Sequence, residues 1–280
     1  MGETGRQQAV VIVAHVRVCH NREVNLDATS DGNRLAIVTG TSRGIGAAVA
    51  ERLLARRWDV IGIARHWPSI EDARYRHLVF DLEDWAALTD TIEHELGSVV
   101  SDTRWRRIGL VNNAAASGVL GPIETIDPVD LVHLAAVNWV APTWLIGFML
   151  GRTQPDASLR IVNVSSGAAV RAFPGLADYC GSKAALRMTG MVTAEELDSP
   201  LRTAPARGDA AILSYEPGTV DTAMQAAARS RPLAEYPWGG LFRDFAARGT
   251  LVPPAAPAAE IVEFLETDGH PRFTERRLGR

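Results

Sequence analysis

Short apolar runs alternate with helix-length segments from Arg34 onward. Six runs of four or five residues lack the polar alternation of half-exposed strands, which is typical of strands covered on both faces. They are residues 35–38, 60–64, 77–80, 108–111, 160–164 and 210–214. The segments between them are long enough for right-handed crossover helices, so the pattern predicts a parallel sheet.

Helices are expected in five of the remaining segments. They are residues 45–57, 84–96, 128–150, 178–197 and 258–266, the last preceded by a Pro/Ala-rich stretch, 253–259, that is expected to be a loop. The pattern therefore predicts an α/β protein with a single-domain Rossmann fold, a doubly wound parallel sheet flanked by helices over residues 34–280.

Residues 1–33 are expected to be an N-terminal extension, because they end in a polar, turn-rich linker at 27–33. A short strand, a disordered tail and the product of an upstream start codon all remain open for them.

Composition excludes several classes of partner. The chain of 280 residues is 46% hydrophobic and 22% charged, with a formal net charge of -4, which argues against nucleic acid or an anionic membrane. We expect no membrane span, because no apolar run reaches about 18 residues. His15 and Arg17 interrupt the apolar stretch at 9–18, so a signal peptide is not expected either.

The cysteine and histidine content predicts a reduced cytoplasmic protein without a metal. Cys19 and Cys180 are too few for a disulfide framework. His66, His77, His94 and His133 do not have the spacing of metal ligands and are expected to be ordinary core or exposed histidines.

A glycine-rich turn, TGTSRGIG at residues 39–46, follows the first expected strand. Gly40 permits the tight turn into the helix, Gly44 lets the backbone approach a pyrophosphate, and Gly46 lets the helix pack on the strand. Phosphates would then lie at the helix N-terminus, where free N–H groups and the helix dipole favour anions. A turn that merely uses glycine is the alternative, but the strand before it and the helix after it favour a dinucleotide site.

The end of the second strand favours NADP(H) over NAD(H). NAD-binding units usually place an acid there to hold the ribose 2′-hydroxyl, whereas this strand ends in Ala64-Arg65-His66. The Arg65 guanidinium can instead bind a 2′-phosphate with two N–H groups, and Arg43 in the glycine-rich turn can face the same phosphate. The alternative is that both arginines are solvated surface residues in an Arg-rich chain.

Tyr179 and Lys183 are the strongest catalytic candidates. A spacing of four residues places both on one face of a helix, one turn apart. A nearby ammonium is expected to lower the pKa of the phenol and to donate hydrogen bonds to ribose hydroxyls. The pair is notable because the chain has 4 tyrosines, while Lys183 is the one lysine among 29 basic residues. Ser166, after the fifth strand, lies thirteen residues before Tyr179 and can hold a substrate carbonyl; alone it would be an ordinary turn residue.

Together these residues resemble the short-chain dehydrogenase/reductase family. The resemblance runs from about Leu35 to the last helix and includes the glycine-rich turn, Asn112-Asn113-Ala114, Asn138, Ser166, Tyr179, Lys183 and Pro217-Gly218-x-x-x-Thr222. It implies a catalytic set of Asn138, Ser166, Tyr179 and Lys183, with Asn138 holding a water. The implied cofactor set is Gly40, Ser42, Arg43, Gly44, Ile45, Gly46, Arg65, Asp81, Leu82, Asn112, Ala114, Tyr179, Lys183, Pro217, Gly218, Val220 and Thr222.

Two longer motifs indicate a branch of this family. VSSGAA at 164–169 and EPGTVDTAMQ at 216–225 look like the benzil reductase and sepiapterin reductase-like branch, which reduces diketones and similar activated carbonyls with NADPH. Two features depart from the family pattern. Ala115 stands where glycine is usual, and residues 273–280 lack the Gly-rich ending that many members use in tetramers, which leaves a homodimer or a monomer open.

The expected reaction is hydride transfer from NADPH to a ketone or diketone, with Tyr179 as the proton donor and a small-molecule carbonyl as substrate. Pocket candidates are Val119, Leu120, Ala168, Phe173, Met224 and Trp238, all of which are equally compatible with plain loop packing. Two other functions remain open: an NAD-linked alcohol dehydrogenase that runs toward oxidation, and a non-catalytic NADPH-binding scaffold protein.

Overall fold

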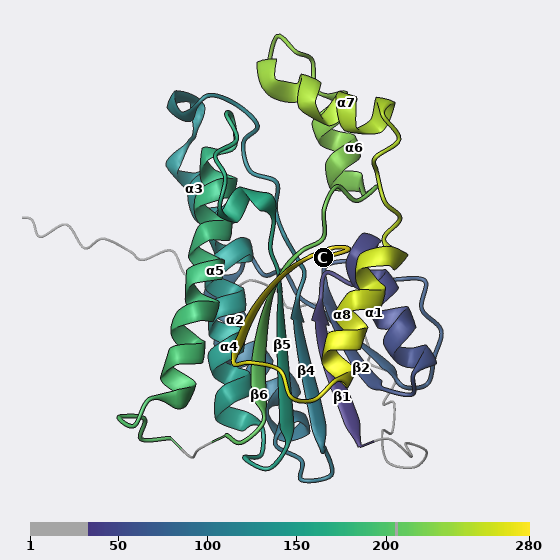
Figure 1. Ribbon diagram of the computed structural model, residues 1–280, viewed down its shortest axis with the longest axis vertical. Coiled ribbons are helices and arrows are strands. Elements are labelled where there is room, and N and C mark those ends of the chain that lie inside the picture. The colour runs from purple at the N-terminus through teal and green to yellow at the C-terminus, as the bar shows by residue number, and fades with distance from the viewer. Residues whose placement is uncertain (1–32, 205–206) are drawn as a thin grey trace, which may run out of the picture.

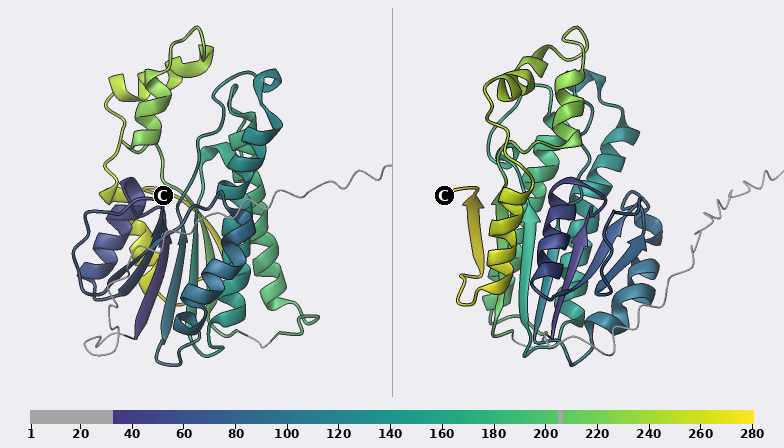
Figure 2. Two further views of the ribbon diagram at one scale, coloured as in Figure 1. Left: turned by 180° about the vertical axis from the view of Figure 1, so that it is seen from behind. Right: turned by 90° about the vertical axis from the view of Figure 1, so that its right-hand side faces the viewer.

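The computed structural model describes residues 33–204 and 207–280, and it is built around one parallel sheet. Seven strands lie in the order β3-β2-β1-β4-β5-β6-β7, and every neighbouring pair is parallel (Figures 1 and 2). The strands are β1 (Arg34–Thr39), β2 (Asp59–Ala64), β3 (Tyr75–Val79), β4 (Arg107–Asn112), β5 (Ser158–Val164), β6 (Ala210–Glu216) and β7 (Phe273–Arg277). The predicted fold class is confirmed. The expected extension at 1–33 lies outside the described residues, except for Asn33.

Helices cover both faces of the sheet and bury two apolar layers against it. On one face, α1 (Gly44–Ala55) and α8 (Ala255–Glu266) pack on a core that includes Val38, Val111 and Val162. On the other face, α2 (Trp85–Val100), α4 (Ala141–Arg152) and α5 (Ala177–Asp198) pack on a core that includes Ile37 and Leu110. Because successive strand residues point to opposite faces, each buried strand supplies both layers.

The helix expected at 128–150 is interrupted. It consists of α3 (Pro128–Ala135), a π-helical turn η2 (Ala136–Val140) and α4. In the described part of the chain, Pro128–Arg152 is the one helical stretch long and apolar enough to cross a membrane, with a mean hydropathy of 1.4. However, 56% of its most apolar 18-residue stretch is buried inside the fold. Leu145 and Met149 are core residues, so packing on the sheet explains why this helix is apolar.

Three other sequence expectations need correction. The strand expected at 77–80 runs from Tyr75 to Val79. The loop expected at 253–259 is wrong, because α8 already begins at Ala255; Pro257 lies in its first turn, where a missing N–H costs little. The seventh strand was not expected, because β7 reads Phe-Thr-Glu-Arg-Arg, and an edge strand of this kind does not form an apolar run.

A helical segment stands above the carboxyl ends of the strands. It comprises α6 (Ala223–Ser230) and α7 (Gly240–Ala247), at the top of Figure 1, and was also not expected from the sequence. Ligands of doubly wound folds bind at the carboxyl ends of the strands, so this segment lies where a substrate would be covered.

Candidate active site

The glycine-rich turn after β1 has the shape that a dinucleotide phosphate requires. Gly40 and Gly44 have φ angles of +75° and +63°, which side chains with a Cβ rarely adopt. A Cβ at Gly46 would lie 2.3 Å from the carbonyl oxygen of Gly40, so only glycine allows α1 to approach the turn. Within the described chain, Arg43 makes no side-chain cap bond to α1, which leaves the first N–H groups of the helix available to an anion. The turn therefore fits the dinucleotide pyrophosphate that the sequence predicted here.

The turn is tied to the end of β4. The Thr39 hydroxyl oxygen accepts hydrogen bonds from the backbone N–H groups of Asn113 (3.0 Å) and Ala114 (2.9 Å). Leu82, Asn112 and Ala114, among others, surround a narrow gap beside these bonds that is too small for a water molecule. Three of the predicted cofactor residues, from two separate segments, thus lie close together.

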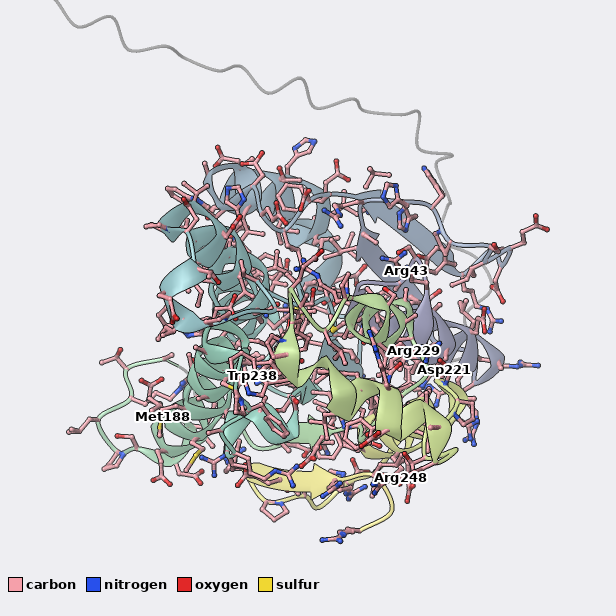
Figure 3. The ribbon with its side chains drawn as sticks, turned by 90° about the horizontal axis from the view of Figure 1, so that it is seen from above. Arg43, Met188, Asp221, Arg229, Trp238 and Arg248 are labelled. Atoms are coloured by element: carbon pink, nitrogen blue, oxygen red, sulfur yellow. The ribbon has the colours of Figure 1, made fainter. Side chains whose placement is uncertain are left out.

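Arg65 and Asp81 also lie together. The Arg65 Nη1 atom is 3.6 Å from Asp81 Oδ2, and both side chains are exposed at the ends of neighbouring strands. Arg43 is exposed at the start of α1, on the end of the molecule toward which Figure 3 looks. Two of the predicted basic residues are therefore accessible at the carboxyl ends of the strands. Ser42 is half-buried, and Ile45 packs partly against the core under α1.

A second turn, which follows β6, lies against the glycine-rich turn. Gly218, after β6, has a φ of +72°, and Val220 forms a bridge with Val252. Thr222 caps α6, and its Cγ2 atom is 3.5 Å from the position of a Cβ on Gly44. The predicted segment Pro217–Thr222 therefore reaches the glycine-rich turn.

Tyr179, Lys183 and Ser166 converge at the N-terminus of α5. Tyr179 is half-buried in the first turn of α5, whereas Lys183 is only 2% exposed. The Lys183 ammonium donates to the carbonyl oxygen of Val164 over 2.9 Å and lies 5.7 Å from the centre of the Tyr179 ring. The Ser166 hydroxyl is hydrogen-bonded to the Tyr179 phenol and accepts a bond from Ala168 N–H at 3.1 Å. The hydroxyl, the phenol and the ammonium thus form one cluster.

The expected lowering of the Tyr179 pKa is wrong. Burial raises the pKa of the phenol to about 12, and the Ser166 hydrogen bond offsets only part of that effect. Burial also lowers the pKa of Lys183 to about 8. The desolvation of the phenol therefore outweighs the influence of an ammonium that is itself bonded to a backbone carbonyl. At neutral pH Tyr179 holds its proton, as a proton donor must.

Asn138 lies in the π-helical turn and is completely buried. Its side-chain oxygen accepts a bond from Ala116 N–H (2.8 Å), and its amide donates to the Ala116 carbonyl (3.0 Å) and to Ser182 Oγ (3.1 Å). These contacts join the segment after β4 to α5. The role of Asn138 in holding a water stays a prediction.

Aromatic and aliphatic side chains form an apolar cluster beside Tyr179. Its buried members are Leu120, Leu176, Ala228 and Tyr236, with Phe173, Tyr179, Cys180 and Phe242 packed against them. Of the predicted pocket residues, Leu120 and Phe173 belong to it, and Trp238 adjoins it, with its ring 6.2 Å from that of Tyr236. The other predicted pocket residues, Val119, Ala168 and Met224, do not belong to this cluster in the described part of the chain. The sequence missed Tyr236 and Phe242 because they come from the helical segment above the sheet, which has no strand pattern.

Asp178 is a further residue that the sequence did not indicate. Its carboxylate is 6% exposed and accepts hydrogen bonds from Val119 N–H (2.8 Å) and Tyr179 N–H (2.7 Å). Gly118 is required at this contact, since it has a φ of +72° and a Cβ there would lie 2.4 Å from the carboxylate. Asp178 therefore fastens the loop after β4 to the helix turn that carries Tyr179. The sequence signal that could have indicated Asp178 is an acid directly before Tyr179, together with Gly118.

Comparison with known proteins identifies the family. The short chain dehydrogenase family model matches residues 34–232, which include the glycine-rich turn and the Ser166–Tyr179–Lys183 cluster. The chain belongs to the short-chain dehydrogenase family. The family prediction is thus confirmed, and with it the function of an oxidoreductase that acts on small molecules with NAD(P)(H).

Individual relatives of this short-chain dehydrogenase agree with the predicted branch. A benzil reductase ((S)-benzoin forming) from Bacillus cereus is 29% identical over 248 residues, covering 85% of this chain and 96% of that protein. A sepiapterin reductase from Xenopus tropicalis is 26% identical over 257 residues, covering 85% and 94%. A crystal structure of a short-chain dehydrogenase/reductase from Burkholderia vietnamiensis is similar at a TM-score of 0.60 and 32% identity, over 70% of this chain and 88% of that one.

Proposed function

We propose that this protein is an NADPH-dependent carbonyl reductase for ketones and diketones of the benzil kind. The observation that carries the proposal is that Ser166, Tyr179 and Lys183 lie together at the N-terminus of α5, with Tyr179 packed against the apolar cluster. The similarity to benzil reductase supports the substrate class. Turnover of NADPH with benzil tests it; the absence of turnover with benzil, other diketones, quinones, pterins and aldehydes would refute it.

Each residue of the cluster has one task in the proposed reaction. NADPH, when bound, supplies the hydride. Ser166 donates a hydrogen bond to the carbonyl oxygen and so orients and polarises it. The Tyr179 phenol gives its proton to that oxygen as the carbonyl carbon is reduced, leaving a phenolate that regains a proton from solvent. The bond to Val164 uses one of the three N–H donors of Lys183, so the ammonium can also donate to ribose hydroxyls.

The Tyr179 phenol is in its acid form at neutral pH, which is the form that the reductive step uses. With a pKa near 12, the phenol is almost fully protonated at pH 7 and is ready to act as an acid. In the oxidative direction the same group would have to act as a base, and its base form is scarce at that pH.

The choice of NADPH is testable at Arg65. Replacing Arg65 by alanine is expected to raise the Kd for NADPH by roughly 10- to 100-fold, because a charge-assisted hydrogen bond to phosphate is worth about 1.5–3 kcal/mol. The Kd for NADH, which has no 2′-phosphate, should remain near that of the parent. Fluorescence titration of both dinucleotides measures the effect, with Arg106→Ala as a matched control, since Arg106 is an exposed arginine paired with Asp156. Equal binding of NADPH and NADH by the parent protein would overturn the cofactor assignment.

The buried lysine predicts an alkaline limit on activity. The folded-state pKa of Lys183 is about 8, below its ordinary value of 10.5, so the ammonium is lost as the pH rises through 8. We expect kcat/KM for NADPH to fall about tenfold per pH unit above that point, since kcat/KM reports the groups of the free enzyme. Lys183→Arg, whose side chain stays charged, should have lower activity without this limb. A parent profile that is flat from pH 7 to pH 10 would contradict the assignment.

A further inference from the structure

Three buried polar side chains form a continuous hydrogen-bonded chain beneath the glycine-rich turn. The Thr41 hydroxyl lies 2.9 Å from the Tyr75 hydroxyl, which in turn lies 2.9 Å from Nδ1 of His77. Their exposed fractions are 0%, 7% and 3%, respectively. None of these residues has a task in the reaction proposed above.

A glycine in β2 makes the space for this chain. A Cβ on Gly62 would lie 2.1 Å from the Tyr75 hydroxyl oxygen and 2.5 Å from Thr41 Oγ1. Gly62 is paired in register with His77 on the neighbouring strand. Any larger residue at this position would push the phenol and the threonine apart, so the sheet is shaped around this contact.

The hydrogen-bonded side chains connect the glycine-rich turn with the segment after β2, the two parts of the proposed dinucleotide site. Thr41 lies within the turn between Gly40 and Gly44, and Gly40 N–H donates to Ile63 in β2 over 2.8 Å. At the other end, the ring of Trp67 covers His77 at 4.8 Å between ring centres. Trp67 follows Arg65 by two residues, so the far end of the chain supports the segment that carries the proposed 2′-phosphate ligand.

We infer that Tyr75 is a positioning residue for dinucleotide binding, which holds the glycine-rich turn through Thr41 and supports the Arg65–Trp67 segment through His77. This inference rests on the proposed function only in that the turn must bind a dinucleotide. The phenol suits the task because it can donate one hydrogen bond and accept another. The two bonds of the phenol tie Thr41 to His77, although the Nε2 atom of His77 is buried without a hydrogen-bond partner among the described residues.

Both titratable members of the chain are neutral at neutral pH. Burial raises the pKa of Tyr75 to about 12, against a smaller opposing effect of the Thr41 hydrogen bond. Burial also lowers the pKa of His77, partly offset by the nearby Ala64 backbone. The hydrogen-bonded side chains therefore require no counter-ion. Loss of the Thr41 hydroxyl removes one hydrogen bond and loss of the Tyr75 hydroxyl removes two, in neither case leaving an isolated charge.

A double-mutant cycle between Tyr75→Phe and Thr41→Val tests the inference. Thr41→Val is expected to raise the Kd of both NADPH and NADH by about 3- to 10-fold, the equivalent of one buried hydrogen bond, and Tyr75→Phe by at least as much, because its hydroxyl is bonded to both Thr41 and His77. The double variant should bind about as well as the weaker single variant, because both substitutions remove the same bond. Thr41→Ser, which keeps the hydroxyl, should restore affinity. Isothermal titration calorimetry measures the parent and the four variants, and steady-state kinetics should show the loss in KM for the dinucleotide more than in kcat.

Tyr215→Phe is the matched control, because Tyr215 is also a fully buried tyrosine, with its hydroxyl bonded to Glu260 on α8 instead. It should bind both dinucleotides as the parent does. Unchanged affinity in Tyr75→Phe, or losses that add in the double variant, would overturn the inference. Should Tyr75→Phe fail to fold, Thr41→Val compared with Thr41→Ser decides the matter alone. A parent protein that binds neither dinucleotide would instead refute the proposed function.

Discussion

Replacing Tyr179 by phenylalanine is expected to lower kcat for carbonyl reduction by about 10²- to 10⁴-fold, the usual contribution of a positioned general acid. The variant keeps the ring, which packs against the apolar cluster beside the site, and loses only the hydroxyl that is bonded to Ser166. Because burial keeps the phenol protonated at neutral pH, the loss should appear across the whole neutral range. The affinity for NADPH should persist, since the glycine-rich turn and Lys183 are unchanged.

Single-turnover reduction of benzil, together with an NADPH titration of the same samples, separates chemistry from binding. Tyr215→Phe again serves as control, because it removes a buried phenolic hydroxyl on another strand. If Tyr179→Phe retained kcat within about threefold of the parent, Tyr179 could not be the proton donor, given the size of the effect expected from a general acid. If it lost NADPH binding as well, the hydroxyl would be required for the cofactor before any chemistry.

The parts of this site that the sequence revealed are those encoded by local spacing. The turn at residues 39–46 depends on glycines within eight positions, and the Tyr179–Lys183 pair depends on one turn of a helix. In both cases the chemistry of the residues and the geometry of one element are sufficient, and the structure brings the predicted residues together. The parallel sheet was predictable for a similar reason, since its buried strands read as unbroken apolar runs.

What the sequence did not reveal depends on contacts between distant segments. The pKa of Tyr179 was predicted with the wrong direction because the extent of its burial is set by the fold and not by its neighbour at position 183. The carboxylate of Asp178 acts on Val119, a residue 59 positions away. Thr41 and Tyr75 meet only because β3 pairs with β2 beside the turn. No spacing rule within one element indicates such pairs.

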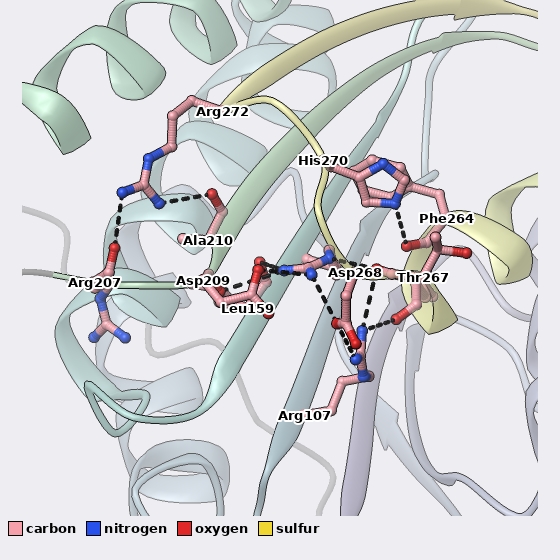
Figure 4. A network of polar contacts seen from close by, with 12 residues as sticks. Arg107, Leu159, Arg207, Asp209, Ala210, Phe264, Thr267, Asp268, His270 and Arg272 are labelled. Carbon is pink, nitrogen blue, oxygen red and sulfur yellow. Dashed lines mark hydrogen bonds and ion pairs between the residues drawn. The ribbon is translucent and has the colours of Figure 1, made fainter.

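The edge strand β7 is held by charges at the end of the sheet opposite the active site. Figure 4 shows Arg107, Asp209, Thr267 and Asp268 in a network of polar contacts near the loop that leads from α8 to β7. At its centre Arg160 is completely buried, with Nη2 2.7 Å from Asp209 Oδ1 and 3.2 Å from Asp268 Oδ1. Its Nε atom also donates to the Thr267 carbonyl over 3.1 Å. One guanidinium thus joins β5, the start of β6 and the loop before β7.

Arg160→Met is expected to lower the free energy of unfolding by about 1–3 kcal/mol, because it removes the charge-assisted hydrogen bonds of the guanidinium, while Asp209 and Asp268 remain solvated at 46% and 70% exposure. Urea denaturation of the parent and the variant measures this change. Arg106→Ala, which removes an exposed ion pair just before the adjacent strand β4, should cost no more than about 1 kcal/mol. Backbone hydrogen exchange in the variant should also be faster than in the parent in β7 but not in β1. The reason is that β7 has only β6 as a neighbour and depends on the loop that Arg160 holds. A loss below about 1 kcal/mol, with β7 still protected, would show that hydrophobic packing of Phe273 retains the strand and that the buried arginine is dispensable.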